Sequence, residues 1–145
     1  AKIFGWGLAF YEIPEAVARS MITIAGNSVP LIYLMIDVIV LIAGCFMETA
    51  SALIILTPIF LPLIAAVGGD PIHFGVVLTI GLAIGMATPP MAINIFVASA
   101  ISGRTLEQIS RAIWPMVVIL IVMLLVCTYF PWFVMVLPKI FMGVK

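Results

Sequence analysis

The stretch GLAIGMATPPMAINIFVASAI, residues 81–101, contains the feature that most constrains the fold of this chain. It belongs to an apolar run, residues 74–101, that is longer than a bilayer core if it is wholly helical, since an α-helix rises about 1.5 Å per residue. Pro89 and Pro90 interrupt this run, because each lacks an N–H group and clashes with the preceding helical turn. Thr88 and Pro89, which each precede a proline, are also pushed out of the helical region. The sequence therefore predicts a discontinuous transmembrane helix over residues 72–101.

The composition of the whole chain supports a membrane setting. Of 145 residues, 66% are hydrophobic, and the mean hydropathy is +1.40 with only six basic and six acidic side chains. A soluble domain of this size cannot bury so much apolar surface, so part of the surface must face lipid. We predict an all-α polytopic membrane protein in contact with the lipid bilayer. The basic residues are scattered, so no nucleic acid partner is expected.

Segment lengths divide the remaining chain. Residues 29–67 hold two apolar arms joined by the polar METAS, residues 47–51, and both arms are short for a full crossing, so we predict a re-entrant helical hairpin. Thr105 and Gln108 have the spacing of a capping box. The other predicted segments are the end of a transmembrane helix that begins upstream, followed by an interfacial amphipathic connector, over 1–28; an interfacial helix over 102–112; and a final transmembrane helix over 113–137. The chain is therefore expected to be part of a longer one.

The two irregular elements suggest a single binding site. A helix broken in lipid leaves carbonyl groups free at the end of its first half and N–H groups free at the start of its second half. The carbonyls of GMAT, residues 85–88, suit a small cation such as sodium, and the N–H groups after Pro90 suit a carboxylate. The hairpin tip offers the complementary residues Gly44, Glu48, Thr49 and Ser51. If the two elements face each other, they form one site.

Asp37 and Glu48 are acidic residues at the predicted depth of the membrane, and two interpretations of them stay open. Intramembrane acids are candidates for function. Alternatively, Asp37 is hydrogen-bonded to a neighbouring helix and Glu48 lies at a wet loop. An intramembrane enzyme that uses the two acids, and a structural scaffold subunit, are the rival functions. No HExxH or GxSxG motif is present, so we do not expect an enzyme. His73 is expected to be a solvated loop residue.

Two stretches, GCFMETASALIILTPIFLPLIAAVGGDPIHFG at 44–75 and IGLAIGMATPPMAINIFVASAISG at 80–103, resemble a known family. They are similar to the C-terminal third of the large membrane subunit of tripartite ATP-independent periplasmic (TRAP) transporters. The resemblance implies one inverted repeat of an elevator-type secondary transporter in a bacterial or archaeal cytoplasmic membrane. It also implies sodium-driven import of organic acid anions such as C4-dicarboxylates, keto acids or sialic acid. The implied partners are a small membrane subunit and an extracytoplasmic substrate-binding protein.

The same resemblance assigns roles to individual positions. It implies that sodium, as the coupling ion, is the only cofactor. Asp37 departs from the family pattern, which has a neutral amide at that point, so no role is transferred to it. The residues that the resemblance implies are Gly44, Gly85, Thr88 and Met91 for sodium, and Ser51, Pro90 and Asn94 for substrate.

Overall fold

The computed structural model describes residues 13–26, 28–89 and 93–142, and all regular structure in this part of the chain is helical. The helices are α2 (Ile13–Ala25), α3 (Val29–Phe46), α4 (Thr49–Ala66), α5 (Pro71–Gly85), α6 (Ile93–Ser102), α7 (Leu106–Tyr129) and α8 (Pro131–Met142). Three of them, α3, α4 and α7, are long and apolar enough to cross a membrane. The prediction of an all-α polytopic membrane protein is confirmed.

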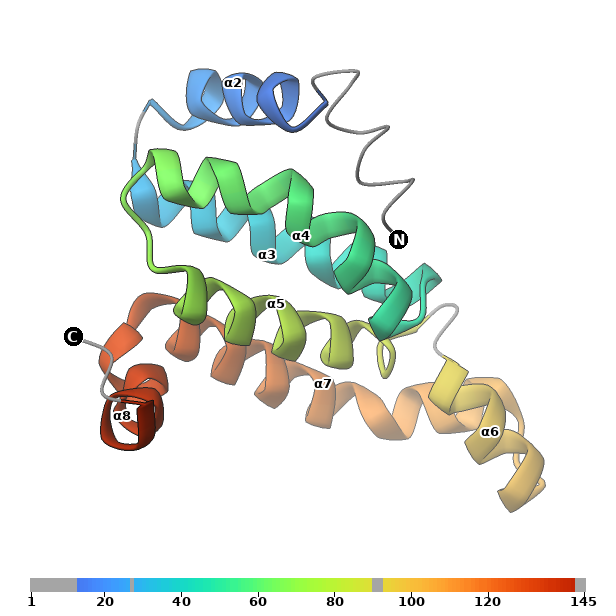
Figure 1. Cartoon of the computed structure of the whole chain (residues 1–145). Coiled ribbons are helices and arrows are strands. Elements are labelled where there is room, and N and C mark those ends of the chain that lie inside the picture. Colours follow the sequence, from blue (N-terminus) through green and yellow to red (C-terminus); the bar gives the residue numbers. More distant parts are fainter. Residues whose placement is uncertain (1–12, 27, 90–92, 143–145) are drawn as a thin grey trace.

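Helices α3 and α4 form the predicted helical hairpin. Helix α3 ends at Phe46, and Glu48 caps the first turn of α4, so only two residues separate the arms. Figure 1 shows the two arms running in opposite directions beside each other. By length each arm is able to cross a membrane, so the re-entrant course of the hairpin stays a prediction. At the far end of α4, Gly68 adopts a φ of +75°, a left-handed conformation that glycine tolerates and that turns the chain towards α5.

The helices stack in layers with α5 near the centre (Figure 1). Helix α3 packs most extensively on α5, and α5 in turn packs on α7, while α2 covers α4 and α3. The main core includes Ile36 of α3, Leu63 of α4 and Leu82 of α5, all fully buried. Helix α2 turns Met21 and Ala25 into this core and leaves its opposite face exposed, as expected for an amphipathic segment.

The predicted interruption is present in the described residues. Helix α5 ends at Gly85, residues 86–89 form turns and bends, and α6 begins at Ile93. Pro90 and Met91 lie outside the described residues. The ends of α5 and α6 therefore bracket the TPP sequence as expected.

The predicted boundary at residue 112 differs from the structure. An interfacial helix over 102–112 and a separate span over 113–137 were expected, but α7 is one continuous helix from Leu106 to Tyr129. The capping box of Thr105 and Gln108 starts it, and a single interior proline, Pro115, does not stop it. The chain instead breaks at Phe130, after which Pro131 begins α8.

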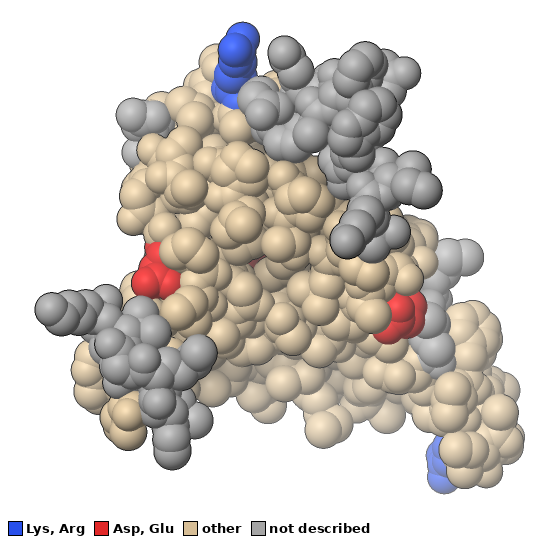
Figure 2. Space-filling model, viewed as in Figure 1, with Lys and Arg blue, Asp and Glu red and all other residues tan. Residues whose placement is uncertain are grey.

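The surface agrees with a lipid environment. Many large apolar side chains are exposed, with α7 contributing Met116, Val118, Ile119 and Val122 among others. Figure 2 shows a face that is almost free of charge, with isolated charged side chains near its outline. A contiguous apolar surface of this kind is unstable in water and suits contact with lipid or with other membrane helices.

Candidate functional site

The first contact of the site is a close crossing of α3 and α5 at two glycines. A Cβ atom added at Gly44 would lie 2.7 Å from the carbonyl oxygen of Leu82 and 3.0 Å from the Cα of Gly85. A Cβ atom added at Gly85 would lie 2.6 Å from the Cα of Gly44. Only glycine at both positions permits this approach of the two backbones. The structure therefore brings together two of the residues predicted to hold sodium.

The hairpin tip also reaches the broken end of α5. The Thr49 hydroxyl donates a hydrogen bond to the thioether sulfur of Met86 at 2.7 Å. The hairpin tip and the end of α5 thus face each other. Within GMAT, the carbonyls and Thr88 were predicted to take part in the site, whereas the Met86 side chain was not, although it directly follows Gly85.

The carbonyls at the end of α5 are partly satisfied by the turn that follows. The carbonyl oxygen of Ile84 accepts hydrogen bonds from the backbone N–H of Ala87 at 3.0 Å and from the hydroxyl of Thr88 at 2.8 Å. The carbonyl oxygen of Gly85 accepts one from the backbone N–H of Thr88 at 2.9 Å. The Thr88 hydroxyl donates its only hydrogen here, which leaves its oxygen lone pairs available. A hydroxyl oxygen whose lone pairs are free is suited to contact a small hard cation.

Glu48 acts as the N-cap of α4. Its carboxylate accepts hydrogen bonds from the backbone N–H groups of Ala50 at 2.9 Å and Ser51 at 3.1 Å, and from the Ser51 hydroxyl at 3.3 Å. The backbone donors of Ala50 and then Ser51 lower the pKa of Glu48 below its ordinary value, since they stabilise the charged form. The Glu48 side chain therefore has a local structural role at the exposed tip, which agrees with its predicted place in a polar loop.

Asp37 does not share the partners of Glu48 but contacts helix α7. Its side chain is 2% exposed, and its Oδ2 atom forms a hydrogen bond of 2.9 Å with the hydroxyl of Thr128 on α7. Of the two interpretations of Asp37, the structure shows the hydrogen bond to a neighbouring helix. Asp37 and Glu48 have separate partners on separate elements, so they do not assemble an acid pair for catalysis.

His73 is where the sequence interpretation was wrong. It was expected in a solvated loop, but it lies in the first turn of α5 and is 3% exposed. Its Nε2 atom is 2.8 Å from the carbonyl oxygen of Cys127, and because a carbonyl only accepts, Nε2 carries the hydrogen. In a longer α7 that carbonyl would bond residue 131, which is a proline without an N–H group. His73 supplies the missing donor and is buried for that reason.

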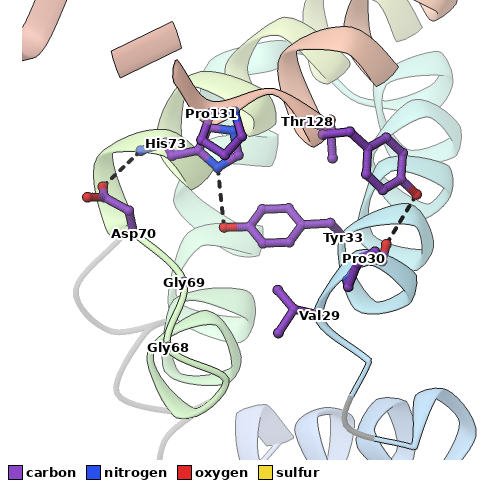
Figure 3. Close-up of a pocket in the computed structure, with 10 residues that line it drawn as sticks. Val29, Pro30, Tyr33, Gly68, Gly69, Asp70, His73, Thr128 and Pro131 are labelled. Carbon is purple, nitrogen blue, oxygen red and sulfur yellow. Dashed lines mark hydrogen bonds between the residues drawn. The ribbon is translucent and has the colours of Figure 1, made fainter. Parts of the chain in front are cut away.

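A cavity of about 340 Å³ lies beside His73 (Figure 3). Tyr33, whose hydroxyl is 3.4 Å from the Nδ1 atom of His73, points into this region, and Asp70 caps α5 by accepting from the backbone N–H groups of residues 72 and 73. The cavity is lined by Val29, Pro30, Tyr33, Gly68, Gly69, Asp70, His73, Thr128, Tyr129 and Pro131. The cavity and the glycine crossing lie at opposite ends of α5. Asp70, which lines the cavity, caps the N-terminus of this helix, and Gly85, which forms the crossing, is its last residue.

The residues predicted for substrate are only partly placed. Ser51 is exposed in the first turn of α4, and Asn94 is exposed in the first turn of α6. Pro90, and Met91 of the sodium set, fall outside the described residues. Among the residues that the structure describes, no group of three or more His, Cys, Asp or Glu side chains is arranged to hold a metal ion. The neutral oxygen groups at the end of α5 are backbone carbonyls and the Thr88 hydroxyl, which are ligands of the kind that a hard cation accepts.

These features define an α-helical membrane protein in which the tip of a helical hairpin meets the end of an interrupted helix. A family model described as "Tripartite ATP-independent periplasmic transporter, DctM component" matches residues 1–133. The chain therefore belongs to the DctM family of TRAP transporter components.

Individual relatives agree with this assignment. The chain is 40% identical over 143 residues to the isethionate TRAP transporter permease protein DctMQ of Oleidesulfovibrio alaskensis, covering 99% of this chain and 22% of that protein. It is 39% identical to the C4-dicarboxylate TRAP transporter large permease protein DctM of Pseudomonas aeruginosa, covering 96% of this chain and 32% of that protein. It is 36% identical to the sialic acid TRAP transporter large permease protein SiaM of Vibrio cholerae, covering 97% and 33%. The chain thus spans between a fifth and a third of these relatives.

Proposed function

We propose that this chain is part of the membrane permease of a sodium-coupled, binding-protein-dependent secondary transporter that imports organic acid anions. The observation that carries the proposal is the backbone contact of Gly44 with Gly85, which holds the hairpin tip against the interrupted end of α5. Transporters commonly build midplane ion and substrate sites from such interrupted helices. An enzyme that uses Asp37 and Glu48 is disfavoured, because the two carboxylates have separate partners.

The substrate class follows from the chemistry that the named relatives share. Isethionate, C4-dicarboxylates and sialic acid are the compounds in their names, and all three are organic acid anions. We propose that the N-terminal end of α6, together with Ser51, Pro90 and Asn94, contributes to recognition of the anionic group, since backbone N–H groups at a helix start favour negative charge. The particular acid depends on residues beyond this chain as well.

The proposed coupling ion is sodium. Its oxygen ligands are the backbone carbonyls of Gly44, Gly85 and Met91 and the hydroxyl of Thr88, all neutral donors of the kind that a hard cation accepts. The proposed assembly includes a small membrane subunit and an extracytoplasmic substrate-binding protein in the cytoplasmic membrane. One relative carries the fused name DctMQ, which is consistent with a second membrane component. Movement of the hairpin and the interrupted helix together would constitute an elevator-type step.

The test is the substitution Thr88→Val in the full-length transporter, with uptake measured in reconstituted vesicles at varied sodium concentration. Valine keeps the β-branched shape and removes only the hydroxyl. A hydrogen bond to a charged group contributes about 1.5–3 kcal/mol, so the half-saturating sodium concentration should rise roughly tenfold to a hundredfold.

Thr79→Val is the matched control. The Thr79 hydroxyl also donates to the carbonyl four residues earlier, at 2.8 Å, and Thr79 is an exposed residue inside α5, the helix that ends shortly before Thr88. It should leave the sodium dependence unchanged. If Thr88→Val behaves like Thr79→Val, the interruption at GMATPP is a hinge or a packing kink, and the proposed ion site is wrong.

A further inference from the structure

The described part of the chain buries three polar side chains almost completely, and none of them belongs to the proposed ion site. They are Asp37, His73 and Thr128, which are 2%, 3% and 4% exposed. The burial of His73 is explained by its hydrogen bond to the carbonyl group of Cys127 at the end of α7. The burial of a carboxyl group at Asp37 is not explained in this way. An amide or a hydroxyl group could join the two helices by a hydrogen bond without the free-energy cost of burying an ionisable group.

The surroundings of Asp37 offer little to stabilise a negative charge. Its hydrogen-bond partner is the Thr128 hydroxyl, and the one ion pair among the described side chains, Arg111 with Glu107, lies on the exposed surface of α7. The other titratable groups on the elements around Asp37 are Tyr33 and Cys45 on α3, Asp70 at the N-cap of α5 and His73 inside it, and Glu107, Arg111, Cys127 and Tyr129 on α7. Of these, His73 directs its two ring nitrogens at Cys127 and Tyr33, not at the carboxyl group.

The hydrogen-bond count at Thr128 favours a proton on Asp37. The Thr128 hydroxyl oxygen is 2.9 Å from Asp37 Oδ2 and also 2.9 Å from the carbonyl oxygen of Leu124. A hydroxyl group has one hydrogen and cannot donate it fully to both acceptors. If Asp37 carries a proton, Asp37 donates to Thr128 and Thr128 donates to Leu124, so that each short contact contains one hydrogen.

We propose that Asp37 is a proton-binding site at the contact between α3 and α7, and that it carries its proton while the two helices are in contact. Thr128 also lines the cavity beside His73, so the residue that binds the buried carboxyl group adjoins this space (Figure 3). Loss of the proton leaves a carboxylate in an apolar contact with a single shared donor. Separation of α3 from α7 and release of the proton therefore favour each other, by thermodynamic linkage.

This inference concerns a proton and does not rest on sodium coupling or on transport. It is tested by infrared spectroscopy on the full-length transporter in lipid vesicles at neutral pH. The wild-type minus Asp37→Asn difference spectrum should contain the C=O stretch of a protonated carboxyl group. The wild-type minus Glu48→Gln spectrum is the control and should contain carboxylate bands and the amide bands of the new glutamine but no protonated-carboxyl stretch, because the Glu48 carboxylate is stabilised by its backbone donors.

The substitution Thr128→Val is an independent test that keeps the carboxyl group of Asp37. It removes the acceptor of the proposed proton, so the C=O band should move to higher frequency, as expected when a hydrogen bond is lost. The proposal is overturned if Asp37→Asn removes carboxylate bands only. If Asp37→Asn does not insert into the membrane, Thr128→Val decides alone, and an unshifted spectrum overturns the proposal.

Discussion

The substitution Gly85→Ala tests the close backbone crossing of α3 and α5. The added Cβ would lie 2.6 Å from the Cα of Gly44 and 2.8 Å from both its carbonyl carbon and the carbonyl oxygen of Leu41. Carbon atoms in contact are normally about 3.5–4.0 Å apart, so α3 and α5 must separate by roughly 1 Å. All three neighbours are backbone atoms, which cannot rotate away. Overpacking of this kind costs about 1–3 kcal/mol.

Gly75→Ala is the matched comparison, since Gly75 lies on the same helix and an added Cβ there meets no atom within 4 Å. Both substitutions improve helix propensity, by up to about 1 kcal/mol, so the difference between the two variants isolates the clash. In denaturant titrations of the full-length transporter, Gly85→Ala should be less stable than Gly75→Ala by about 1–3 kcal/mol. Equal free energies of unfolding would show that α3 and α5 do not cross as closely as described.

The remaining predictions concern His73 and Glu48. His73→Phe should lower the free energy of unfolding by about 1–3 kcal/mol, because the carbonyl of Cys127 loses its donor. Adding Pro131→Ala should recover part of this loss, because it restores a backbone N–H group. If the double variant is no more stable than His73→Phe, His73 does not cap α7. Because the pKa of Glu48 is lowered by folding, its stabilisation is present above the ordinary pKa and is lost as the pH falls through the folded value. The difference in melting temperature between wild type and Glu48→Gln should therefore shrink on acidification, and a difference independent of pH would contradict it.

Features that depend on local rules were predictable from the sequence. Two adjacent prolines, Pro89 and Pro90, remove successive N–H groups and constrain the residue before each of them, and α5 ends at Gly85, ahead of the pair. Thr105 and Gln108 form the reciprocal cap that their spacing predicts, with both hydrogen bonds present. The polar residues between two apolar arms likewise marked the hairpin tip. In each case the determining atoms lie within a few residues of each other, so no tertiary information was needed.

Features that depend on distant partners were not predictable. The burial of His73 follows from a carbonyl 54 residues away, which is free only because Pro131 follows it. Gly44 and Gly85 were selected through the family resemblance and for their backbone freedom, yet their direct contact depends on the crossing of α3 and α5. The continuity of α7 was missed because charged residues at its start resembled a separate interfacial helix, whereas Arg111 and Glu107 pair on its exposed face.

The two ends of α5 are held in different ways, and this difference bears on how the hairpin can move. At its C-terminal end, α5 meets α3 backbone to backbone at Gly85, so the two helices must either shift together or lose the contact entirely. At its N-terminal end, hydrogen bonds through His73 join α5 to α7, and hydrogen bonds through Asp37 and Tyr129 join α3 to α7. These hydrogen bonds can be replaced by hydrogen bonds to water once the helices separate, whereas a glycine crossing has no substitute partner. A displacement of the hairpin that keeps the contact between Gly44 and Gly85 would therefore carry α3 and α5 as one unit and open the polar contacts with α7.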